Sequence, residues 1–122
     1  MLQPTSDPKP ITARLHWLLL DAEYQLTEQD NLIQLSLFYP IGVTTLSCTA
    51  EGEEHFSNYR YQLIRAGNLL RGSGEVIPWA GWVSPHYGTK IPALSLAVEI
   101  LAKPPVRFTS TFNFTTLSGN NL

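Results

Sequence analysis

The sequence predicts an all-β protein built as a mainly antiparallel two-sheet β-sandwich. Apolar residues alternate with polar ones at 33–39 and 106–114, which is the period-two pattern of a half-buried strand. Other segments of strand length are separated by Gly, Pro, Asn or acidic clusters. Because no helical segments alternate with them to cross between parallel strands, we expect the connections to be hairpins or arches.

The chain is expected to divide into a tail or linker at 1–12, one β-domain at 13–117 and a flexible C-terminus at 118–122. The first ten residues contain three prolines, a composition that sustains neither a helix nor a central strand. Alternation begins from Arg14. With the segment that starts at Arg14 and those at 33–39 and 106–114, the candidate strands at 43–49, 59–65 and 94–102 give an expected number of about six to eight.

Residues 94–102 could form a helix or a strand, and residues 106–114 could turn either face toward the core. Residues 94–102 are rich in Leu, Ala and Glu, which are good helix formers, yet Leu94, Leu96, Val98 and Ile100 alternate and favour a strand. In residues 106–114 one face is aromatic and the other is mostly threonine. We therefore expect Phe108, Phe112 and Phe114 to face the core, where removing the Phe112 ring would cost roughly 3–5 kcal/mol.

Composition limits the classes of function. A chain of 122 residues corresponds to one domain, and its net charge of −2 provides no basic field for nucleic acid or anionic lipid. The single cysteine, Cys48, can form neither an internal disulfide nor a zinc site. The apolar run at 15–20 is too short to span a membrane, and the first ten residues have no apolar segment of the signal-peptide kind, so we expect no signal peptide in this sequence. We expect a soluble chain with no nucleic-acid or membrane partner, and its localisation is left open.

The residues that could form catalytic or metal-binding motifs favour structural interpretations. "GSGE" at 72–75 lacks the context of a nucleophile elbow or a phosphate loop and is typical of a hairpin turn. His16, His55, His86 and the acidic segment at 51–55 could supply metal ligands, but we expect a charged hairpin tip and neither metal nor cofactor. His16 lies between Leu15 and Trp17 and is expected to face away from both.

Five residues around 79–90 are candidates for binding a carbohydrate. They are Trp79, Trp82, His86, Tyr87 and Lys90. The aromatic rings could offer flat apolar faces to sugar rings, but burial of the tryptophans between two sheets is the interpretation we favour. His86 and Tyr87 could trade a proton, yet neighbours in a strand face opposite sides. We expect a turn in which Pro85 fixes the backbone and Gly88 has a positive φ.

The stretch "GWVSPHYGTKIPALSL" at 81–96, with "YQLIRAGNLLRGSGEV" and "LHWLLLDAEYQL" before it, resembles the C-terminal β-region of heparinase II/III-like polysaccharide lyases. A Gly-Trp-x-Ser-Pro-x-Tyr-Gly-x-Lys-x-Pro-Ala run precedes the last strands of that family. The matching positions are Gly81, Trp82, Ser84, Pro85, Tyr87, Gly88, Lys90, Pro92 and Ala93. The resemblance covers residues 13–115 and implies that Trp82 and Tyr87 cover the edge of the core while Lys90 pairs with a carboxylate.

The resemblance does not carry over any catalytic residue. Members of the family take their catalytic tyrosine and histidine from a helical toroid and a central sandwich, and these 122 residues match neither. The leading hypothesis is therefore an accessory, non-catalytic β-domain of a polysaccharide-lyase-like protein. The alternative is a free-standing carbohydrate-binding module with an aromatic platform. Expected partners are a polysaccharide, a separate catalytic domain or a second copy of the chain, and exposure of the tryptophans separates the two hypotheses.

Overall fold

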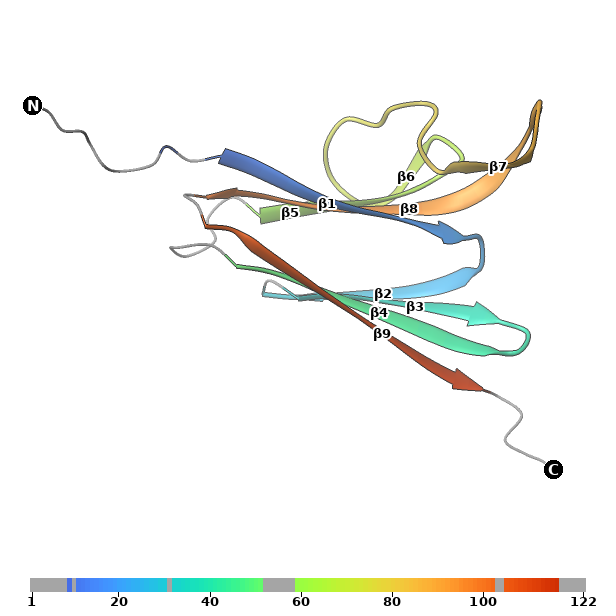
Figure 1. Cartoon of the computed structure of the whole chain (residues 1–122), viewed down its shortest axis with the longest axis horizontal. Helices are drawn as coiled ribbons and strands as arrows, with labels where there is room; N and C mark the ends of the chain where they lie inside the picture. Colours follow the sequence, from blue (N-terminus) through green and yellow to red (C-terminus); the bar gives the residue numbers. More distant parts are fainter. Residues whose placement is uncertain (1–8, 10, 31, 52–58, 103–104, 117–122) are drawn as a thin grey trace, which may run out of the picture.

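The computed structural model confirms the all-β prediction. It describes residues 9, 11–30, 32–51, 59–102 and 105–116. Within these residues the chain forms nine strands in two sheets that pack face to face (Figure 1). The strands are β1 (Ile11–Leu20), β2 (Glu23–Gln29), β3 (Leu32–Tyr39), β4 (Gly42–Glu51), β5 (Tyr59–Arg65), β6 (Asn68–Gly72), β7 (Trp82–His86), β8 (Thr89–Ala102) and β9 (Arg107–Thr116).

The two sheets have different strand orders. The five-stranded sheet runs β1-β8-β5-β6, with β7 also paired to β8, and the four-stranded sheet runs β2-β3-β4-β9. Every ladder is antiparallel, as predicted. The short β1–β2 connection joins the sheets, and Arg65 fixes it by donating from Nε and Nη2 to the Asp21 carboxylate at 2.8 and 2.6 Å.

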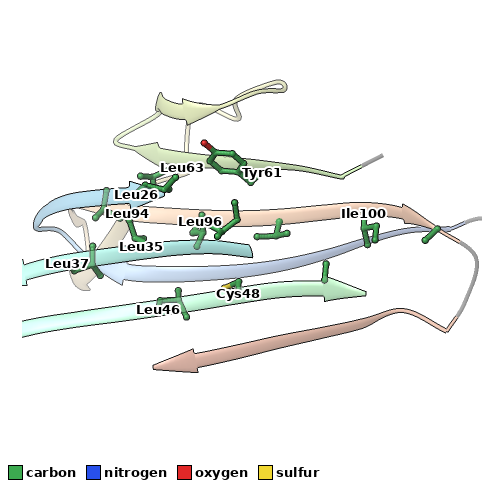
Figure 2. Packing of buried hydrophobic residues seen from close by; sticks show 14 residues of the cluster. Leu26, Leu35, Leu37, Leu46, Cys48, Tyr61, Leu63, Leu94, Leu96 and Ile100 are labelled. Carbon is green, nitrogen blue, oxygen red and sulfur yellow. The ribbon is translucent and has the colours of Figure 1, made fainter. Parts of the chain in front are cut away.

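Alternation along each strand places the core between the sheets. Leu35, Leu37 and Leu46 from the four-stranded sheet meet Leu94 and Leu96 from β8, and all five are buried (Figure 2). Burial of this apolar surface is the main favourable contribution to folding, at about 25 cal/mol per Å². The strand predicted at 94–102 is confirmed as part of β8, although its composition suits a helix.

The prediction for 106–114 is correct for orientation and wrong for burial. Ser110 and Phe112 face the opposite sheet, where Ser110 accepts a 3.1 Å hydrogen bond from Trp17 and the Phe112 ring meets Trp17 edge-on at 5.0 Å. Phe108 is half-buried against the core, but Phe112 and Phe114 remain 44% and 52% exposed. The reason is position, because β9 is an edge strand and pairs only with β4.

The boundaries of the fold differ slightly from those expected. β1 begins at Ile11, two residues inside the segment expected to be a tail, and β9 ends at Thr116. The predicted C-terminal segment at 118–122 lies outside the described residues. Nothing in the described part of the chain forms a helix long and apolar enough to cross a membrane.

The exposure of Phe112 predicts an order of mutational costs. Leu96→Ala should lower the free energy of unfolding by about 2–5 kcal/mol, because the residue is fully buried in the central strand. Phe112→Ala should cost roughly half of the 3–5 kcal/mol typical of a buried ring. Urea unfolding of both variants measures this order, and a larger loss for Phe112→Ala would show that β9 is more deeply packed.

Candidate functional site

A row of three charged side chains crosses the outer face of the five-stranded sheet. The register pairs Glu99 on β8 with Arg14 on β1 at one side and with Arg60 on β5 at the other. Arg14 Nη1 donates to Glu99 Oε2 at 3.0 Å, and Arg60 Nε donates to Oε1 at 2.8 Å. The Glu99 side chain is only 17% exposed. Hydrogen bonding from Arg60, followed by that from Arg14, lowers the pKa of Glu99, although burial opposes the shift.

The β6–β7 connection arches over this outer face (Figure 1). Ser73 N–H donates to the Tyr61 carbonyl at 3.0 Å, and the Gln62 side-chain amide donates to the Glu75 carbonyl at 2.7 Å. Gly74 lets the two segments approach, because a Cβ there would lie 2.9 Å from the Gln62 amide nitrogen. These contacts hold the connection against β5.

A groove of about 430 Å³ lies between the connection and the charged row. Its lining includes Arg14, Arg60, Gln62, Glu75, Ile77 and Glu99. The volume is within the range of small-ligand sites, and the lining combines guanidinium groups, carboxylates and one apolar side chain. The groove therefore offers both donors and acceptors beside an apolar surface.

Trp79 stands next to this groove along the chain. Ala80 N–H donates to the Ile77 carbonyl at 2.9 Å, which closes a turn with Pro78 and Trp79 at its centre. Trp79 is 75% exposed, so the prediction that the tryptophans are buried between the sheets is wrong for it. The position in a turn explains this, because the two central residues of a turn point away from the segments it joins.

The "GWVSPHYG" stretch begins where β7 takes over from β5 as the neighbour of β8. β5 ends at Arg65 opposite Leu94, and the Gly81 carbonyl then accepts hydrogen bonds from Ala66 N–H at 2.9 Å and Ala93 N–H at 2.8 Å. β7 continues the ladder from Trp82. Gly81 has a φ of +82°, and a Cβ there would lie 2.7 Å from Ala66 N. Glycine is therefore required at this junction by both conformation and space.

Beyond Gly81, β7 and β8 form a hairpin with internal side-chain contacts. Lys90 Nζ lies 4.4 Å from the centre of the Trp82 ring, and Trp82 Nε1 donates to the Pro78 carbonyl at 3.3 Å. Ser84 Oγ lies 2.8 Å from the His86 carbonyl and 2.6 Å from that of Thr89, across the end of the hairpin. Pro85 falls where the register shifts, a position that suits a residue without an N–H.

The five candidate carbohydrate-binding residues do not form one platform. Trp82 and Lys90 are brought together, so Lys90 meets an aromatic face where a carboxylate was expected. His86 is exposed, and Tyr87 is fully exposed in the turn at the hairpin tip, so the expectation that Tyr87 covers the core edge is wrong. The expected positive φ of Gly88 is confirmed at +79°. The turn follows His86, which leaves Pro85 in the strand.

Sequence reasoning missed the groove residues. Arg14 and Arg60 lie 85 and 39 residues from Glu99, so only the sheet order brings them together. Cross-strand pairing of β1, β8 and β5 is the signal that could have found them.

His16 and Ser95 form the other polar contact on this face. His16 points to the outer face, as expected, with Nε2 2.6 Å from Ser95 Oγ. Desolvation, followed by the Arg14 charge, lowers the pKa of His16. Ser95 is buried, so this pair is built as a structural bond rather than an accessible nucleophile with its base. No cluster of metal-ligating side chains occurs in the described ranges, and His55, Glu53 and Glu54 lie outside them.

The two hairpin glycines provide a matched pair of predictions. Gly88→Ala should cost about 1 kcal/mol, because φ is positive but nothing lies within 4 Å of an added Cβ. Gly81→Ala should cost at least about 2 kcal/mol, since strain is combined with a backbone clash. Thermal unfolding of both variants tests whether β7 takes over from β5 beside β8 at Gly81. Equal costs for the two variants would contradict this junction.

The charged row predicts a pH dependence. The pKa of Glu99 in the folded protein lies below its ordinary value of 4.5, so the row stabilises the fold above that pH and loses its effect as pH falls through the lowered pKa. Glu99→Gln should lower the melting temperature at neutral pH, and its difference from the unmodified protein should shrink in acid. Glu28→Gln, at an exposed position of β2 without an ion pair among the described residues, is the control. A difference that is constant with pH would contradict the assignment.

Comparisons with known proteins add no relative to this picture. No family model, curated protein or solved structure matches the chain.

Proposed function

We propose that this chain is a non-catalytic carbohydrate-binding β-domain whose ligand lies on the outer face of the five-stranded sheet. The observation that carries the proposal is the groove of about 430 Å³, which joins a charged row to a connection bearing the largely exposed Trp79. A sugar ring has hydroxyl groups that both donate and accept hydrogen bonds, together with an apolar C–H face. A site for such a ring needs paired donors and acceptors beside an apolar or aromatic surface.

The charged row supplies the polar part of this site. Each guanidinium group has five N–H donors and, within the described residues, donates one hydrogen bond to Glu99, which leaves others for a ligand. Arg14 and Arg60 balance the formal charges of Glu75 and Glu99. A groove without surplus charge favours hydroxyl-rich ligands over strongly ionic ones. Because Glu99 already holds both arginines, part of the ordering cost of binding is met in the free protein.

The connection supplies the apolar part. Ile77 lines the groove, and Trp79 follows it in the same turn. The exposed indole leaves a large apolar area in contact with water, which is unfavourable. Contact with the apolar face of a sugar ring would remove the Trp79 indole from water, which explains why this turn carries an exposed aromatic residue.

A second candidate function is an accessory role beside the catalytic part of a polysaccharide-lyase-like protein. The exposed hairpin tip supports it, because the positions shared with the lyase motif build a rigid hairpin that displays Tyr87 fully to solvent. Such a ring is suited to contact another domain. This candidate is compatible with carbohydrate binding at the groove, since the hairpin tip does not line that groove.

Binding to a panel of neutral and acidic oligosaccharides tests the proposal. We expect neutral cello-oligosaccharides to shift the tryptophan emission of the chain, and Trp79→Ala to weaken binding at least about tenfold. Arg60→Gln should also weaken it, whereas Phe38→Ala, an exposed aromatic on the other sheet, should not. Ultraviolet absorbance of the same mixtures should stay flat, because no unsaturated product forms.

Three results would contradict it. Absence of binding across the panel, or unchanged binding by Trp79→Ala, would remove the groove as a saccharide site. A sustained rise in absorbance would remove the non-catalytic assignment.

A further inference from the structure

The four outermost strands of the two sheets differ in how they are protected from pairing with other chains. β1 and β6 end the main path of the five-stranded sheet, and β2 and β9 end the four-stranded sheet. An edge strand carries backbone N–H and C=O groups that can pair with a further strand, and proteins prevent this with charges, prolines, bulges or short edges.

Three of these edges carry such protection. β1 has Arg14 and His16 at exposed positions, and β2 has Glu23 and Glu28. β6 has only five residues, and its ladder with β5 contains a register shift. Charge and irregularity therefore oppose the addition of a strand at β1, β2 and β6.

The β9 edge has none of these features. It is ten residues long and pairs with β4 without interruption from Arg107 to Thr116. Arg107, at its first position, is its only charged residue, and it contains no proline. Phe112 and Phe114 remain about half exposed on the face toward the other sheet. Among the residues that the structure describes, no strand pairs with this edge, so β9 offers backbone groups together with apolar surface.

The sequence of β9 is complementary to itself. In antiparallel pairing about a two-fold axis at Thr111, Phe108 meets Phe114 of the second copy, and Thr109 meets its Asn113. The pairs repeat on the other side of the axis, and Thr111 meets its own equivalent. Residues on the outer face meet only residues of that face, as a two-fold axis perpendicular to the sheet requires. Arg107 meets Thr115 of the second copy, so no like charges face each other.

We propose that β9 is a self-association edge, at which a second copy of this chain pairs antiparallel to form one continuous eight-stranded sheet from two four-stranded sheets. Aromatic and threonine cross-strand pairs stabilise such a ladder. We take the partner to be another copy because this register pairs Phe108 with Phe114 and Thr109 with Asn113, places Phe112 opposite Ser110, and sets no like charges against each other. The proposal does not depend on carbohydrate binding, since the groove lies on the other sheet.

Light scattering during size-exclusion chromatography of the full chain tests this interface. We expect the unmodified chain to have twice the mass of one copy, and Thr111→Lys to have the mass of one copy because it places two ammonium groups opposite each other. Thr27→Lys is the matched control, since Thr27 is exposed on the same outer face but on the opposite edge strand β2. It should remain a dimer.

A cross-linking experiment tests the register independently. Opposed residues in an antiparallel pair have Cα atoms about 4.5–5.5 Å apart, which a disulfide can span. Thr111→Cys should therefore form a covalent dimer under mild oxidation, whereas Thr27→Cys should not, and Cys48 is buried in both proteins. A monomeric unmodified chain, a dimeric Thr111→Lys, or a dimer in which Thr111→Cys does not cross-link would overturn the proposal.

Discussion

The backbone ladder of β8 is the constraint on which the rest of the structure depends. This strand pairs with β1 along one side and with β5 and then β7 along the other. Its inner side chains fill the core, and small outer residues such as Ser95 and Ala97 are buried as well. In its buried part, large inner and small outer side chains distinguish the two faces of the strand, which strongly specifies its register and so places both the groove and the hairpin.

The change of partner from β5 to β7 connects this ladder to the candidate site. β5 must leave β8 for the β6–β7 connection to arch over the sheet, and Gly81 then restores the ladder. Gly67 contributes on the other side, since a Cβ there would lie 2.6 Å from the Pro78 carbonyl. The β6–β7 connection beside the groove and the start of the β7–β8 hairpin therefore meet at one junction. Close backbone packing at Gly67 and Gly81 fixes the position of the turn that contains Trp79.

Sequence patterns predicted most strands but not their neighbours. Alternation follows from burial of one face, so it identified the segments of β3, β4 and β9 and the inward orientation of Phe112. It says nothing about sheet order, and the edge position of β9 leaves Phe112 and Phe114 about half exposed. The number of strands was underestimated because β2, β6 and β7 were missed: β2 is mostly polar, and β6 and β7 have only five residues each. The turn glycine Gly88 was predictable because its requirement is local.

The candidate site was only partly predictable for the same reason. The aromatic and hairpin residues are neighbours in sequence, whereas the charged row joins three strands from distant parts of the chain. The row is also the more demanding arrangement, because a carboxylate with little exposure must be paired to remain charged. Two arginines bind the Glu99 carboxylate, where one would be enough to neutralise its charge, and both arginines line the groove. One arginine would suffice for a structural ion pair, so the second arginine supports our proposal that the groove takes a ligand.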